Sequence, residues 1–131
     1  MSEQSAFLII DDNSIDRMIS NTLLKKCLDN PEVYAKENVG DALNWLKSER
    51  INLDRKLIIL LDMRMPDVDG FGFLEEYEKL DSSITANNDI IMLSAMDESS
   101  EQTQKAKLNP IVKAVLDKPL DVDALSQVIY S

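Results

Sequence analysis

Short apolar runs that end in polar or charged residues recur along this chain, separated by longer segments with apolar residues at helical spacing. Such runs predict parallel strands that are buried on both faces of a sheet, and the longer segments predict helices. The predicted strands lie near residues 6–10, 32–37, 57–61, 90–93 and 112–116. The predicted helices lie near residues 14–28, 39–50, 70–80, 98–108 and 121–130.

The strict alternation of strands and helices indicates an α/β fold. Right-handed crossovers between parallel strands place helices on both faces of the sheet, which predicts a three-layer sandwich. A single five-stranded unit favours a flavodoxin-like fold over the longer dinucleotide-binding fold. The segment 32–37 alternates polar and apolar residues, so we expect it to be an edge strand.

Two of the predicted helices differ in their apolar pattern. The segment 98–108 has almost no apolar stripe. Such a helix is either weakly anchored and able to shift with the state of a nearby site, or simply solvated, and the sequence leaves both readings open. The first helix, by contrast, carries one apolar stripe, made of Ile15, Met18, Ile19, Leu23 and Cys27.

Composition narrows the class of protein. A chain of 131 residues with 44% hydrophobic residues fits one soluble globular domain. Its apolar runs are too short to span a membrane, and its first residues lack the features of a signal peptide. A single cysteine, Cys27, excludes an internal disulfide and suits a reducing compartment. We therefore expect a cytoplasmic protein.

The charge of the chain limits its partners and its chemistry. A formal net charge of -10 makes nucleic acid and anionic membranes poor direct partners, whereas a divalent cation or a basic partner is favoured. The chain contains no histidine. It therefore cannot be a histidine-ligated zinc hydrolase, a Ser-His-Asp enzyme or a phosphohistidine carrier.

The candidate functional residues are those that end the predicted strands. Because ligands bind beyond the carboxyl ends of the strands in an open parallel sheet, we expect these side chains to converge at one edge. No glycine-rich phosphate loop follows the first strand, and two carboxylates there would repel a nucleotide phosphate. The residues are Asp11 and Asp12, Asp62, Ser94 and Lys118.

Three carboxylates at one edge predict a magnesium site, because Mg²⁺ prefers hard oxygen ligands and would relieve their mutual repulsion. Asp62 is then the candidate nucleophile, since a carboxylate can attack phosphorus and form an aspartyl phosphate. Lys118 would hold oxygens of the transferring group, and Ser94 would donate a hydrogen bond to it. Pro119 restricts the backbone before it and helps to orient Lys118, and we expect a cis peptide bond between them.

Each residue alone has an ordinary structural explanation, such as helix capping for Asp11 and Asp12, so the argument depends on the whole set. The set resembles the response-regulator receiver domain of bacterial two-component signalling, in its stand-alone, chemotaxis-regulator form. The resemblance covers essentially the whole chain and implies the strand order 2-1-3-4-5. It is carried by Asp11-Asp12, by Asp62-Met63-Arg64-Met65-Pro66-Asp67-Val68-Asp69-Gly70, by Ser94-Ala95 and by Lys118-Pro119.

The resemblance implies how the metal would be held. Asp12 and Asp62 would ligate Mg²⁺ directly, together with the backbone carbonyl of Arg64. Asp11 would act largely through a water molecule.

The resemblance also implies roles in phosphoryl transfer. Asp62 would be the phosphoacceptor, Ser94 the switch hydroxyl and Lys118 the lysine that contacts the phosphoryl group. The donor would be a phosphohistidine on a sensor histidine kinase or a histidine phosphotransfer protein. The chain would catalyse only its own phosphoryl transfer and dephosphorylation, and would otherwise not be an enzyme.

One family feature is absent, because the position three residues before Lys118 carries Val115 where receivers usually have an aromatic residue. We expect residues 1–131 to be a single receiver domain with no output domain, which signals to an unknown protein target through its own surface. The alternative is a docking module that never takes phosphate. A phosphatase with an aspartate nucleophile is disfavoured, because no second carboxylate lies two residues after Asp62.

Overall fold

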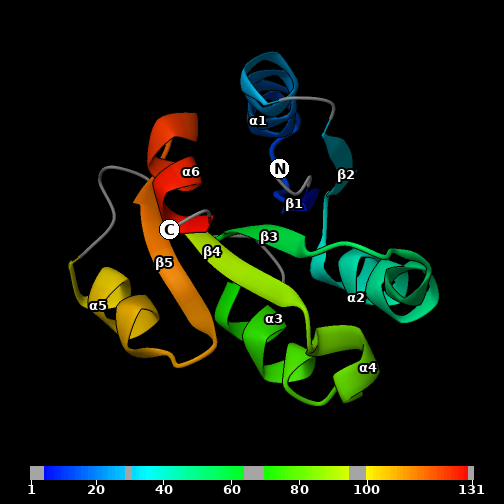
Figure 1. The fold of residues 1–131 in the computed structure, drawn as a ribbon. Helices are drawn as coiled ribbons and strands as arrows, with labels where there is room; N and C mark the ends of the chain where they lie inside the picture. The colour runs from blue at the N-terminus through cyan, green and yellow to red at the C-terminus, as the bar shows by residue number, and fades with distance from the viewer. Residues whose placement is uncertain (1–4, 29–30, 64–69, 95–99, 130–131) are drawn as a thin grey trace.

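The five predicted strands are all present and are paired in parallel in one sheet. In the computed structural model, which describes residues 5–28, 31–63, 70–94 and 100–129, they alternate with helices (Figure 1). The elements are β1 (Ala6–Ile10), α1 (Ser14–Cys27), β2 (Glu32–Lys36), α2 (Val39–Glu49), η1 (Arg50–Asn52), β3 (Leu57–Asp62), α3 (Gly70–Tyr77), α4 (Ser82–Thr85), β4 (Asn88–Ser94), α5 (Ser100–Leu108), β5 (Val112–Asp117) and α6 (Val122–Ile129).

The strand order is β2-β1-β3-β4-β5, which confirms the predicted flavodoxin-like order. Every residue of β1 and β3 is buried, as expected for strands that are covered on both faces. By contrast, β2 lies at an edge and has no fully buried residue. The alternating pattern of 32–37 therefore identified an edge strand correctly.

Two apolar clusters cover the two faces of the sheet and make it the middle layer of three. One cluster combines alternate strand residues with side chains of α2 and α3, and the other combines the intervening strand residues with α1 and α6. In Figure 1, α1 and α6 lie together on one side of the sheet, and α2, α3 and α5 lie on the other. This arrangement confirms the predicted sandwich.

The apolar stripe of α1 does not face the core for most of its length. Ile15, Met18 and Ile19 are 61%, 60% and 39% exposed, and Cys27 is also exposed. The helix instead buries Ser20 and Leu24. Leu24 packs in the cluster formed with α6, so contact with that distant helix decides which face of α1 is covered. Apolar spacing alone could not fix this rotation.

The third predicted helix is shorter than expected. Helix α3 ends at Tyr77, and a separate short helix, α4, follows after Asp81, whose carboxylate accepts a hydrogen bond from the amide of Ser83. Strand β4 starts at Asn88, two residues earlier than predicted. The prediction missed these two residues because they are polar and precede the apolar run. These differences affect the end of the sheet opposite to the carboxyl ends of its strands.

Gly70 starts α3 in direct contact with the backbone of β3. A Cβ atom at this position would lie 2.8 Å from the carbonyl oxygen of Asp62 and 2.7 Å from the methyl carbon of Met92. The carbonyl belongs to a buried central strand and has little room to move. Glycine therefore allows α3 to begin beside the strand end that carries Asp62.

Helix α5 has few apolar anchors, as its sequence predicted. Among the α5 side chains whose burial is described, only Ala106 is fully buried, whereas Leu108 is exposed. The ammonium of Lys105 lies 4.4 Å from the ring centroid of Phe71 on α3, which adds a cation–π contact. Whether α5 shifts remains a prediction. Among the described helices, none has the length and apolar character needed to cross a membrane.

Candidate functional site

The carboxyl ends of β1 and β3 bring three carboxylates together. Ile10 is paired with Leu61, so Asp11 and Asp62 extend from neighbouring strands at the same level of the sheet. One carboxylate oxygen from each of Asp11, Asp12 and Asp62 can be chosen so that all three lie within 4.8 Å of one another. The structure therefore places the predicted acidic residues in one cluster.

Two local hydrogen bonds hold Asp11 in place at the end of β1. Its carboxylate accepts a hydrogen bond from the amide of Asn13 at 3.0 Å, and its carbonyl accepts one from Nη1 of Arg17 at 2.7 Å. Asn13 caps α1, because its side chain accepts hydrogen bonds from the amides of Ile15 and Asp16. Asp11 and Asp62 are only 2% and 6% exposed, whereas Asp12 faces solvent, so the cluster is open on the Asp12 side.

Lys118 places one ammonium among these carboxylates. Its Nζ lies 3.1 Å from Asp11, 3.1 Å from Asp16 and 3.3 Å from Asp62. Burial alone would lower the pKa of Lys118, but attraction by Asp62 and Asp11 outweighs it and raises this pKa above its ordinary value. Lys118 is therefore charged throughout the physiological pH range. The peptide bond between Lys118 and Pro119 is cis, as predicted.

Asp16 is a fourth carboxylate of the site that sequence reasoning missed. It lies in the first turn of α1. The contact of Asp16 with Lys118 joins residues 102 positions apart, and only the folded sheet shows it.

Ser94 ends β4 beside the acidic cluster. Leu93 is paired with Asp62 across the sheet, so Ser94 lies one residue beyond that level and is buried. Its carbonyl accepts a hydrogen bond from the amide of Lys118 at 2.8 Å. The described residues thus hold Ser94 and Lys118 at adjoining strand ends. Arg64, the predicted carbonyl ligand, lies outside the residues that the structure describes.

The donor set fits a hard divalent cation. Among the described residues, four carboxylates, those of Asp11, Asp12, Asp16 and Asp62, gather around the ammonium of Lys118. The excess negative charge favours a cation, and the donors from Asp11, Asp12 and Asp62 are the hard oxygens that Mg²⁺ prefers. A few carboxylates leave other coordination positions open for water or phosphoryl oxygens.

Comparison with a family of known proteins supports the same reading. The sequence profile of the family described as "Response regulator receiver domain" matches residues 7–130, which is almost the whole chain. The match includes the four predicted strand ends that carry Asp11, Asp62, Ser94 and Lys118.

Two curated relatives from Arabidopsis thaliana have similar segments. The histidine kinase CKI1 is 29% identical over 122 residues, which cover 87% of this chain and 11% of that protein. The two-component response regulator ARR2 is 29% identical over 121 residues, which cover 92% of this chain and 16% of that protein. This chain therefore spans less than a fifth of the length of either relative.

Solved structures share the fold over nearly the full chain. The response regulator receiver protein from Dyadobacter fermentans superposes with a TM-score of 0.83 and 28% sequence identity. The superposition covers 95% of this chain and 94% of that one. This protein therefore shares its architecture with that receiver protein over nearly its whole length.

Proposed function

Because the chain belongs to the response regulator receiver domain family, we propose that it accepts a phosphoryl group on Asp62 with the help of Mg²⁺. The observation that supports this most strongly is the joint placement of Asp11, Asp12 and Asp62 with Lys118 at one edge of the sheet. Asp12 and Asp62 would ligate the metal directly, Asp11 through a water molecule, and the backbone carbonyl of Arg64 would complete the protein ligands.

In the proposed reaction, a carboxylate oxygen of Asp62 attacks the phosphorus of a phosphohistidine on the donor protein. A P–O bond to Asp62 forms as the P–N bond breaks, and the donor imidazole leaves with the bonding electron pair. Lys118, whose Nζ lies 3.3 Å from Oδ1 of Asp62, stabilises negative charge on the transferring group. Bound Mg²⁺ would neutralise charge on the phosphoryl oxygens.

The donor is a sensor histidine kinase or a histidine phosphotransfer protein. This proposal agrees with the family and with the absence of histidine from this chain, which leaves the phosphohistidine to a partner. The exposed apolar side chains of Ile15, Met18 and Ile19 on α1 supply a surface on the helix that also carries Asp16. We place the donor on this surface. The chain's own catalysis is limited to phosphoryl transfer and dephosphorylation.

A receiver that never takes phosphate and acts as a docking module is the second candidate. Three features favour phosphorylation over docking alone: the buried position of Asp62, its pairing with Lys118, and the open side of the cluster at Asp12. A docking surface needs none of these. We therefore retain the phosphoacceptor as the proposed function, with a cytoplasmic location and a protein target that receives the signal.

The proposed function is tested by intact mass spectrometry of the protein after incubation with phosphoramidate. With Mg²⁺ we expect the mass of one added phosphoryl group, which hydroxylamine removes because an acyl phosphate is labile to it. With a chelator present we expect no addition. Protein that stays unmodified under both conditions would support the docking module.

Asp12→Ala is expected to weaken Mg²⁺ binding by about tenfold or more, because it removes one of the three clustered carboxylates. Isothermal titration calorimetry measures this directly. The matched control is Asp54→Ala, since Asp54 is also exposed but lies outside the cluster. Equal affinity in the Asp12 variant and wild type would contradict the metal assignment.

Ser94→Ala and Val115→Ala are expected to have opposite effects. Val115 is half-buried and packs on the α2 and α3 face, so its truncation should cost about 1–2 kcal/mol of stability and leave the phosphate response intact. Valine is too short and too stiff to swing between buried and exposed states. Ser94→Ala should spare the fold and blunt the response, because the phosphoryl group loses a hydrogen-bond donor.

Hydrogen exchange with and without beryllofluoride and Mg²⁺ distinguishes the two variants. In wild type, we expect the largest change in α5, the helix with the fewest apolar anchors. If a Val115→Ala protein folded normally but showed no change of hydrogen exchange in α5, residue 115 would be what couples the phosphorylation site to α5. Equal changes in all helices of wild type would remove α5 from the proposed path.

A further inference from the structure

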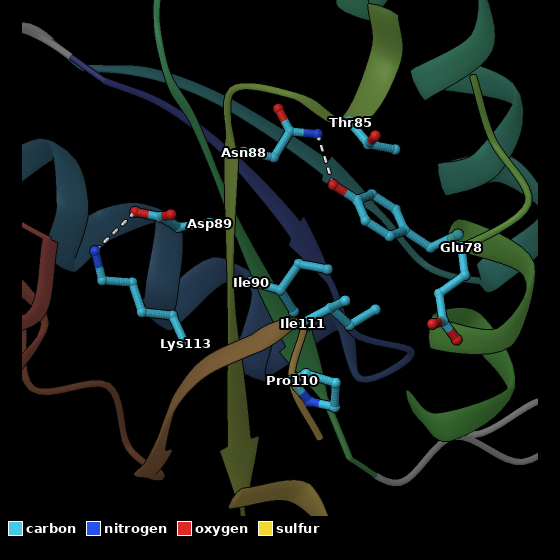
Figure 2. Close-up of a pocket in the computed structure, with 9 residues that line it drawn as sticks. Glu78, Thr85, Asn88, Asp89, Ile90, Pro110, Ile111 and Lys113 are labelled. Carbon is cyan, nitrogen blue, oxygen red and sulfur yellow. Dashed lines mark hydrogen bonds and ion pairs between the residues drawn. The ribbon is translucent and has the colours of Figure 1, made fainter. Parts of the chain in front are cut away.

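A cavity of about 570 Å³ lies at the amino-terminal ends of β4 and β5, opposite to the end that carries Asp62. Its volume falls within the range of small-molecule sites. Figure 2 shows that its lining comes from α3, α4, β4 and the segment that enters β5. We call it the amino-end cavity. Its lining residues are Tyr77, Glu78, Thr85, Asn88, Asp89, Ile90, Pro110, Ile111 and Lys113.

One wall of the amino-end cavity is apolar. Ile90, Pro110 and Ile111 lie together in Figure 2, on the side where β4 approaches the segment before β5. Tyr77 adds an aromatic ring that is almost fully buried in the same cluster as Ile90. This wall can cover the hydrocarbon part of a ligand.

The Tyr77 hydroxyl provides a hydrogen-bond donor next to this wall. It accepts a hydrogen bond from Nδ2 of Asn88 at 2.9 Å, drawn as a dashed line in Figure 2. No acceptor for its own proton is found among the described residues. Burial raises the pKa of Tyr77, so the hydroxyl keeps that proton at neutral pH. An acceptor oxygen on a ligand could accept a hydrogen bond from this hydroxyl.

A buried positive charge stands behind Asn88. The guanidinium of Arg50 donates to Oδ1 of Asn88 at 2.7 Å and to three backbone carbonyls, and Arg50 is 5% exposed. Within the described part of the chain, no carboxylate contacts it. A buried cation without a counter-ion creates a positive potential at its neighbours, here Asn88 and Tyr77.

Asp89 and Lys113 line the cavity entrance, but their side chains lie on the side of β4 opposite to those of Asn88 and Ile90 in Figure 2. The carboxylate of Asp89 is shared there by two ammonium groups, those of Lys56 at 2.8 Å and Lys113 at 3.3 Å, so its charge is compensated. Glu78 is the one other carboxylate in the lining, but it is exposed, and its carboxylate points away from Asn88 in Figure 2.

From this arrangement we propose that the amino-end cavity binds a small molecule with an apolar body and one carboxylate group. The carboxylate accepts a hydrogen bond from the Tyr77 hydroxyl, and the positive potential of Arg50 favours its charge. The body packs on Ile90 and Ile111. This site is independent of Asp62 and of the metal cluster.

Occupancy of the cavity would also restrain the entry to β5. The amide of Ile111 donates a hydrogen bond to the side chain of Asn109, and the amide of Val112 donates one to the backbone carbonyl of Asn109. These bonds form a tight turn that joins α5 to the cavity wall. A ligand that packs on Ile111 holds this turn against α3 and α4. Slower hydrogen exchange at the end of α5 is therefore expected in the bound protein.

The test is an NMR titration of the full chain with hydrocinnamate, which has a phenyl body and one carboxylate. Hydrocinnamamide and phenylpropylamine are matched neutral and cationic probes. We expect amide shifts at Thr85, Asp89 and Ile111, and affinity for hydrocinnamate about tenfold or more above that for either matched probe. Equal binding of the neutral probe, or shifts confined to the Asp62 end of the sheet, would overturn the proposal.

Two variants test the assigned contacts. Tyr77→Phe should weaken hydrocinnamate binding about tenfold, because the ligand loses its hydrogen-bond donor. Ile111→Ala should weaken this binding about threefold or more, because the phenyl body loses a packing surface. Ile111 is only partly buried, so its variant keeps the test valid even if Tyr77→Phe unfolds. Glu78→Gln is the control on the same rim and should not weaken binding. Unchanged affinity in both the Tyr77 and Ile111 variants would contradict the assigned contacts.

Discussion

Asp62→Asn is expected to reduce phosphoryl incorporation to the level of a reaction without phosphodonor, while the protein stays folded. The amide of asparagine has nearly the same shape as the carboxylate but is not a nucleophile towards phosphorus. Asp62 is buried at the end of β3, and Lys118 keeps its contacts with Asp11 and Asp16 when the charge at 62 is removed. The loss should therefore be chemical and not structural.

Intact mass spectrometry with phosphoramidate and Mg²⁺ measures this loss, and circular dichroism checks the fold. The control is Asp54→Asn, which removes an exposed carboxylate from the loop before β3 and should be phosphorylated as wild type. Incorporation that persists in the Asp62 variant would mean that another carboxylate accepts the phosphoryl group. Peptide mapping would then identify it, with Asp12 as the first residue to examine.

Lys118→Met is expected to lower the free energy of unfolding by about 3 kcal/mol at neutral pH in the absence of Mg²⁺. The change removes an ammonium that contacts Asp11, Asp16 and Asp62, two of which are buried. The mutual repulsion of these carboxylates then increases. Added Mg²⁺ should recover part of the loss, because a cation replaces the missing charge.

Urea unfolding with and without Mg²⁺ measures both effects. Lys113→Met is the matched control, since Lys113 forms a more exposed pair with Asp89, and we expect it to cost about 1 kcal/mol or less. If Lys118→Met matched that control, the ammonium would not stabilise the cluster. Phosphoryl incorporation should also fall in the Lys118 variant, and this loss is a second, independent measurement of the role of Lys118.

The pH dependence of this contribution follows from the raised pKa of Lys118. A group whose pKa is higher in the folded state stabilises that state fully below the unfolded value, here 10.5, and loses this effect as the pH rises through the folded value. The stability difference between wild type and Lys118→Met due to this ammonium should therefore persist from neutral pH to about pH 10 and shrink only in stronger alkali.

The sequence by itself determined the sheet and most of the site. The apolar runs of β1 and β3 are local signals, because a strand buried on both faces needs apolar residues at every position. The rule that parallel strands end at one edge then placed Asp11, Asp62, Ser94 and Lys118 together without any knowledge of contacts. The structure brings the Lys118 ammonium to that cluster.

Only the tertiary structure decided how the helices turn and which distant residues meet. The exposed face of α1 depends on its packing with α6, so Ile15 and Met18 are exposed although their spacing resembles a core stripe. Asp16 reaches Lys118 across 102 positions, and Arg50 reaches Asn88 across 38. Such pairs do not appear as a spacing pattern in the sequence. The reason is that a polar side chain becomes buried where a distant partner accepts or donates its hydrogen bonds, and its neighbours along the chain do not reveal that partner.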